Sequence, residues 1–61
     1  MIKLHKLNKS VFYLNINLIE RIEEAGDTII TLVDGKSLRV IDEPEEIIQR
    51  IKNYQREIHA L

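Results

Sequence analysis

The sequence predicts an α+β fold, in which a small antiparallel β-meander of four to five strands precedes one C-terminal α-helix packed on a sheet face. Two observations support this prediction. Residues 1–41 alternate apolar and polar side chains mostly with a period of two, whereas residues 44–60 repeat apolar side chains at helical spacing. The chain has 61 residues, which suffice for one core, so we expect residues 1–61 to form a single domain.

The first two strands are expected at the N-terminal end of the chain. Residues 1–7 alternate apolar and polar side chains, as a strand with one buried face does. Asn8 and Lys9 stand where a two-residue hairpin turn would lie. Residues 10–14 are rich in β-branched and aromatic side chains and form the expected return strand. Residues 15–17 hold two asparagines, which favour a turn because their side chains bond nearby backbone.

The middle of the chain contains one ambiguous segment and one clear hairpin. Residues 18–24 suit either one turn of helix or a short strand. We favour a strand, because the Gly-Asp dipeptide at residues 26–27 follows as a turn and residues 28–33 then read as an unambiguous strand. The Asp-Gly dipeptide at residues 34–35 is the strongest hairpin signal, and residues 36–41 form the returning strand.

The last element is a helix of about residues 44–60. Its opening proline suits the first helical position, and the two glutamates after it complement the positive end of the helix dipole. Glu43 would be the N-cap, with Asp42 as the alternative. A glutamate–arginine pair at i,i+4 adds a few tenths of a kcal/mol. One apolar stripe is expected along this helix, made of Ile47, Ile48, Ile51, Tyr54, Ile58 and Leu61.

The alternation also predicts a core and an uncovered face. Because one helix covers only one face of a sheet, apolar side chains on the other face stay exposed, which is uncommon in so small a monomer. The candidate interface residues on that face are Val11, Tyr13, Ile29 and Val33. Alternatively, strong curl of the sheet or residues 15–24 cover it. The predicted core residues are Phe12, Leu14, Ile30, Leu32, Leu38, Val40, Ile47, Ile51, Tyr54 and Ile58.

Composition argues against a chemical function. The sequence has no cysteine, which excludes disulfides and thiolate metal sites. His5 and His59 are expected to be solvated, and Glu57 cannot share a helical face with His59 at i,i+2, so no metal site is expected. Neither serine lies in a recognisable nucleophile setting, and so short a chain can hardly enclose a substrate. We therefore expect no catalytic residue, no cofactor and no enzymatic activity.

Charge and hydropathy bear on the partner and the compartment. The net charge is −1, which gives no reason to expect nucleic acid, since phosphate binding uses clustered cations. Three lysines near Phe12 and Tyr13 leave single-stranded nucleic acid as an alternative. No apolar stretch approaches the ~20 residues of a membrane span, and the N-terminal residues lack the continuous apolar region of a signal peptide. We expect a cytoplasmic protein without membrane insertion.

Several short strings, in register from residue 2 to about residue 56, resemble a known family. They are Lys6-Leu7-Asn8, Phe12-Tyr13-Leu14-Asn15, Leu18-Ile19-Glu20, Ile22-Glu23-Glu24, Asp27-Thr28-Ile29-Ile30-Thr31-Leu32, Gly35-Lys36 and the Glu-rich start of an Ile-rich helix. Together they resemble the FlbD family of small flagellar proteins, which includes the swarming motility protein SwrD. The chain departs from the family at two turns. It has Lys9 where the family usually has Gly, and Gly26 where Pro commonly precedes Asp-Thr.

The resemblance implies a non-enzymatic cytoplasmic accessory protein encoded among flagellar genes. Proteins of this kind support swarming by raising flagellar motor power through the stator units MotA and MotB, which implies an association with the motor at the inner membrane face. The resemblance implies no cofactor. The small core adds the expectation of a homo-oligomer. The alternatives are a small nucleic-acid-binding regulator of motility genes and a structural subunit of the flagellar basal body or export apparatus.

Overall fold

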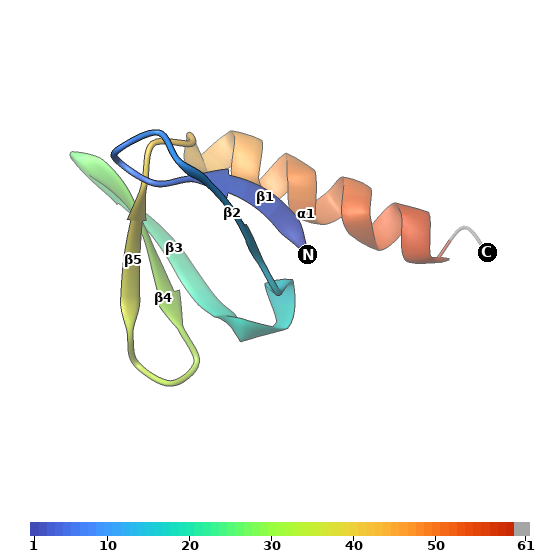
Figure 1. Cartoon of the computed structure of the whole chain (residues 1–61). Helices are drawn as coiled ribbons and strands as arrows, with labels where there is room; N and C mark the ends of the chain where they lie inside the picture. Colours follow the sequence, from blue (N-terminus) through green and yellow to red (C-terminus); the bar gives the residue numbers. More distant parts are fainter. Residues whose placement is uncertain (60–61) are drawn as a thin grey trace.

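The computed structural model describes the backbone of residues 1–59 and the side chains of residues 1–57. Five strands and a C-terminal helix make up this part of the chain, which confirms the predicted α+β class (Figure 1). The elements are β1 (Ile2–His5), β2 (Val11–Leu14), the 3₁₀ turn η1 (Ile16–Leu18), β3 (Ile19–Ala25), β4 (Asp27–Leu32), β5 (Ser37–Val40) and α1 (Pro44–His59).

The strands form two antiparallel sheets rather than one continuous meander. β1 pairs with β2, from Ile2 opposite Leu14 to His5 opposite Val11. The second sheet has the order β3-β4-β5. An isolated bridge between Lys6 and Val40 joins the end of β1 to β5, and Figure 1 shows the two sheets facing each other.

The meander is interrupted between β2 and β3 because η1 redirects the chain. Asn15 caps this turn, and its side-chain oxygen accepts a hydrogen bond from the backbone N–H of Asn17 at 3.0 Å. The ambiguous segment of the sequence therefore contains both structures, since a helical turn ends at Leu18 and a strand begins at Ile19. The backbone N–H of Val33 donates to the Leu18 carbonyl at 2.8 Å and fixes the junction against the end of β4.

Two hairpin turns have three residues each, whereas two-residue turns were expected at Asn8-Lys9 and Asp34-Gly35. The N–H of Lys6 donates to the carbonyl of Ser10, and the N–H of Leu32 donates to that of Lys36. Only the last residue of each three-residue turn has a positive φ, at 73° for Lys9 and 92° for Gly35. Lys9 thus adopts a conformation that favours glycine.

The core lies where the two sheets and α1 meet. Its buried residues are Ile2, Leu4, Leu14, Ile30, Val40 and Ile47. The predicted core residues that are only partly buried, packed against this cluster, are Phe12, Leu32, Leu38, Ile51 and Tyr54. The side chains of Ile58 and Leu61 lie outside the described residues. The predicted core lacked Ile2 and Leu4 of β1, both of which are buried.

The start of α1 corrects the expectation for Ile48 and confirms the expected N-cap. Ile48 is 44% exposed, so it does not belong to the buried stripe, whereas Ile47 is 0% exposed. The N–H of Ile47 donates to the Glu43 carbonyl, which makes Glu43 the residue that precedes the first helical turn. The Asp42 carboxylate does not cap the helix, because its oxygens accept hydrogen bonds from other parts of the chain.

Within residues 1–59, no helix has the length and apolar character that a membrane crossing requires.

Candidate protein-binding surface

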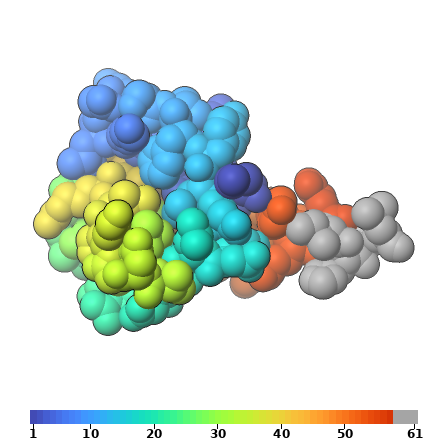
Figure 2. Space-filling model, turned by 60° about the horizontal axis from the view of Figure 1, so that its bottom comes forward, coloured from blue at the N-terminus to red at the C-terminus, as the bar shows by residue number. Residues whose placement is uncertain are grey.

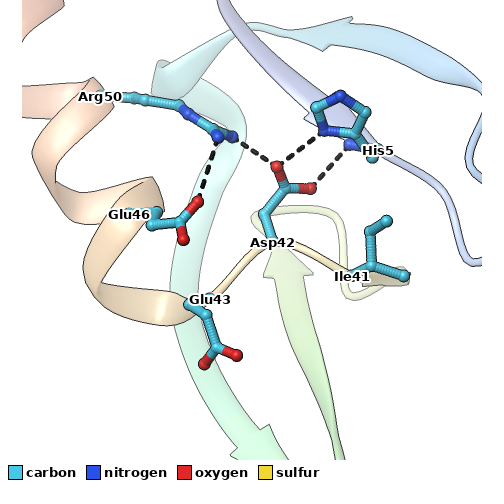
Figure 3. Close-up of a pocket in the computed structure, with 6 residues that line it drawn as sticks. All are labelled: His5, Ile41, Asp42, Glu43, Glu46 and Arg50. Atoms are coloured by element: carbon cyan, nitrogen blue, oxygen red, sulfur yellow. Dashed lines mark hydrogen bonds and ion pairs between the residues drawn. The ribbon is translucent and has the colours of Figure 1, made fainter.

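Asp42 ties together three elements that are distant in the sequence. It lies in the link between β5 and α1, and its side chain is only 3% exposed. One carboxylate oxygen accepts the backbone N–H of His5 at 2.7 Å. The other contacts Nδ1 of His5 at 2.8 Å and accepts a hydrogen bond from Nη1 of Arg50 at 2.5 Å. The carboxylate therefore joins β1, the β5–α1 link and α1 (Figure 3).

Arg50 extends this network to the backbone of β1. Its Nη1 also donates to the carbonyl oxygen of Lys3 at 2.9 Å, and its Nη2 donates to Glu46 at 3.3 Å. The i,i+4 pair that the sequence suggested is thus present, but Arg50 makes its shorter contact with Asp42. No buried polar side-chain atom among the described residues lacks a hydrogen-bond partner. We call this fully hydrogen-bonded cluster of His5, Asp42, Glu46 and Arg50 the polar clamp.

The ionisation of Asp42 is set by these contacts. Burial acts to raise the pKa of the Asp42 carboxyl, but hydrogen bonds from Arg50 and His5 outweigh burial and lower the pKa from 3.8 to about 2. The carboxylate is therefore ionised at neutral pH and can only accept hydrogen bonds. It follows that Nδ1–H of His5 is the donor of the hydrogen bond to Asp42.

A shallow hollow of about 370 Å³ lies over this clamp. Its lining residues are His5, Ile41, Asp42, Glu43, Glu46 and Arg50. Figure 3 shows the Asp42 carboxylate pointing between Arg50 and His5, with Glu43 turned away. Among the described residues, no group of three or more His, Cys, Asp or Glu side chains is arranged to hold a metal ion. The hydrogen bonds give the cluster a structural role, because they hold β1, the β5–α1 link and α1 together.

The prediction that His5 is solvated is wrong. Its side chain is 30% exposed and its ring nitrogen is bonded to Asp42. The side chain of His59 lies outside the described residues. The sequence could not reveal the contact, because 37 positions separate the two residues. The only local signal is that Asp42 precedes the helix proline, where it reads as a cap.

The predicted interface residues fall on two different hairpins. Val11 and Tyr13 lie on β2 and are 47% and 63% exposed. Ile29 lies on β4, where its cross-strand neighbours Glu23 and Arg39 are charged. Val33 is exposed in the turn after β4. The structure therefore does not bring the four residues together into one patch.

The hairpin that carries Val11 and Tyr13 is also basic. Lys3 lies directly opposite Tyr13, and the exposed Lys6 and Lys9 lie at the turn end of the same hairpin. No acidic residue occurs in residues 1–19. Figure 2 shows the hairpin, in blue, forming one side of this face of the molecule, beside the yellow-green hairpin of β4 and β5. An exposed aromatic ring beside unopposed cations is a surface suited to binding.

The fold and this surface define a small α+β protein that presents a basic, partly apolar hairpin. Comparison with known families adds a specific assignment. The model of the FlbD family, described as flagellar and swarming motility proteins, matches residues 1–59. The chain belongs to the FlbD family and is a flagellar and swarming motility protein. No curated protein and no solved structure matches it significantly.

Proposed function

We propose that the chain is a non-enzymatic accessory protein that supports swarming by raising flagellar motor power through contact with another protein. The proposed partner is the stator, formed by MotA and MotB, and the proposed location is the cytoplasmic side of the motor at the inner membrane. Membership of a flagellar and swarming motility family supports the setting. The proposed role is in motor output rather than in the chemistry of a substrate.

One observation of the structure carries the binding part of the proposal. The outer face of the β1–β2 hairpin exposes Val11 and Tyr13 beside three lysines. Tyrosine is enriched where protein surfaces meet, because its ring is apolar and its hydroxyl is polar. The hollow over Asp42 is a less suitable binding site, because its carboxylate and guanidinium already bond each other.

Co-purification from motile cells tests the proposed partner. An affinity-tagged chain, expressed at its native level and cross-linked before lysis, is expected to enrich MotA and MotB over basal-body proteins. A Val11→Asn/Tyr13→Asn variant should lose this enrichment, while an Ile48→Asn variant, changed at an exposed site on α1, should keep it. Enrichment of basal-body subunits without stator proteins would instead identify a structural subunit and contradict the proposal.

The proposal includes self-association through the β3–β4–β5 sheet. Burying an aliphatic side chain contributes roughly 1.5–3 kcal/mol, so several per subunit offset an association cost of ~4–15 kcal/mol. We expect a homo-oligomer at micromolar concentration in sedimentation equilibrium. An Ile29→Thr/Val33→Thr variant keeps strand propensity and should shift toward monomer. A wild-type chain that stays monomeric at high concentration would contradict self-association.

A further inference from the structure

Of the four edge strands of the two sheets, β1 and β5 meet at the Lys6–Val40 bridge. The outer edges, β2 and β3, differ in chemistry. Within the described residues, β2 pairs only with β1, and β3 pairs only with β4. Charged side chains and irregular pairing protect an edge strand from adding a further strand. β3 has both, because its register is irregular between Ile19 and Arg21 and its charged residues are Glu20, Arg21, Glu23 and Glu24.

The edge of β2 has neither protection. Its sequence is Val-Phe-Tyr-Leu, with no charged residue and no proline, and its pairing with β1 is regular. Val11 and Tyr13 project outward, while Phe12 packs against the core and Leu14 is buried in it. A strand added at this edge would bond the free backbone groups of β2 and lay alternate side chains beside Val11 and Tyr13.

Charge indicates which strand would fit. Within residues 1–57, every ion pair uses an arginine or His5 as its cation, so Lys3, Lys6 and Lys9 have no acidic partner there. Lys3 lies beside Tyr13 on β1, one strand away from the free edge. At physiological salt, charges attract each other over ~8–10 Å before screening by ions weakens them. The lysines of the hairpin therefore favour an acidic strand at the β2 edge.

We infer that β2 receives an extended acidic segment of a partner protein, in which apolar and acidic residues alternate. The segment adds to the β1–β2 sheet as a third strand. Because successive side chains point to opposite faces of a sheet, its carboxylates lie on the outer face with Tyr13 and Lys3. Its apolar side chains lie on the core side with Phe12 and Leu14. This inference deepens the proposed function and rests on its premise that the occupant is a protein. A second copy is a poorer occupant, because pairing two β2 edges would place six lysines on one sheet without an acid from either hairpin.

A peptide titration of the full chain tests the inference. The probe is an acetylated, amidated heptapeptide of alternating glutamate and valine, and the readout is the ¹H–¹⁵N NMR spectrum. We expect the largest shifts at Val11–Leu14, with affinity falling as salt rises. A Lys3→Glu/Lys9→Glu variant should bind at least tenfold more weakly. The matched control, Lys36→Glu/Lys52→Glu, makes the same charge change at exposed lysines outside the hairpin and should bind as wild type does.

Backbone pairing is tested separately from charge. The same peptide with alternate amides N-methylated along one edge keeps its carboxylates but cannot donate hydrogen bonds there, so its binding should be lost. Equal binding of the methylated peptide, or of a lysine–valine peptide, would overturn strand addition of an acidic segment. Tighter binding of a single-stranded oligonucleotide would point to nucleic acid, and concentration-dependent shifts of β2 without peptide would point to a second copy.

The peptide experiment contains no flagellar protein, so its failure is distinguishable from failure of the proposed function. Stator enrichment in cells together with no peptide binding at β2 would overturn only the inferred docking mode. Peptide binding at β2 together with no stator enrichment would leave the docking mode standing and overturn the proposed partner.

Discussion

Replacing Ile47 with lysine is expected to abolish cooperative unfolding, whereas the same replacement at the neighbouring Ile48 leaves the fold intact. Ile47 is 0% exposed and lies in the core cluster, while Ile48 is 44% exposed. An unpaired charge in an apolar core costs several kcal/mol. A domain of this size rarely has more than about 3–5 kcal/mol of stability, so one such charge removes most of it.

Thermal unfolding followed by circular dichroism measures this difference. Wild type and Ile48→Lys should show a single sigmoidal transition at similar temperatures, and Ile47→Lys should show none. Ile51→Lys should lose most of its stability too, although Ile51 is only partly buried. If Ile47→Lys melted within a few degrees of wild type, α1 would not be packed on the sheets as described.

Replacing Asp42 with asparagine is expected to destabilise the protein by roughly 2–3 kcal/mol, because it removes the negative charge that Arg50 and His5 share. This loss of stability is smaller than the loss expected for a fully buried ion pair, because the Arg50 side chain is 32% exposed. Urea unfolding at pH 7 measures the change. Glu45→Gln is the matched control, because it also removes one carboxylate but at an exposed position in the first turn of α1.

The same pair of variants should differ in its response to acid. Because the folded-state pKa of Asp42 is lowered to about 2, its contribution is present above about pH 4 and is lost as the pH falls toward 2. Over that interval, the stability difference between wild type and Asp42→Asn should shrink by roughly 2 kcal/mol. A difference that stays constant between pH 5 and pH 2 would show that Asp42 is not held by the clamp.

The elements that the sequence predicted correctly depend on local patterns. Apolar spacing and an opening proline place α1 at Pro44–His59, and Gly26 and Gly35 mark two hairpins, where both have positive φ. The positive φ of Lys9 was not predictable from residue type, since lysine does not favour that conformation. The three-residue turn geometry around it explains the value.

The parts that could not be predicted depend on contacts between distant residues. The alternation put Ile2 and Leu4 on one face of a strand, but it did not show that β1 would lie at the centre of the core, against α1. Similarly, Asp42 reads locally as a helix cap, and only the three-dimensional arrangement brings it to His5. The separation into two sheets also divided a single predicted interface into two surfaces.

The stall torque of single motors in tethered cells tests most directly whether the chain acts on the flagellar motor through contact at a folded surface. In cells that lack the native gene, wild type and the exposed-site control Ile48→Asn are expected to restore full torque. Val11→Asn/Tyr13→Asn should still unfold in one cooperative transition yet leave torque at the level of the deletion. Full torque from that folded variant, or unchanged torque after deletion of the gene, would contradict this role.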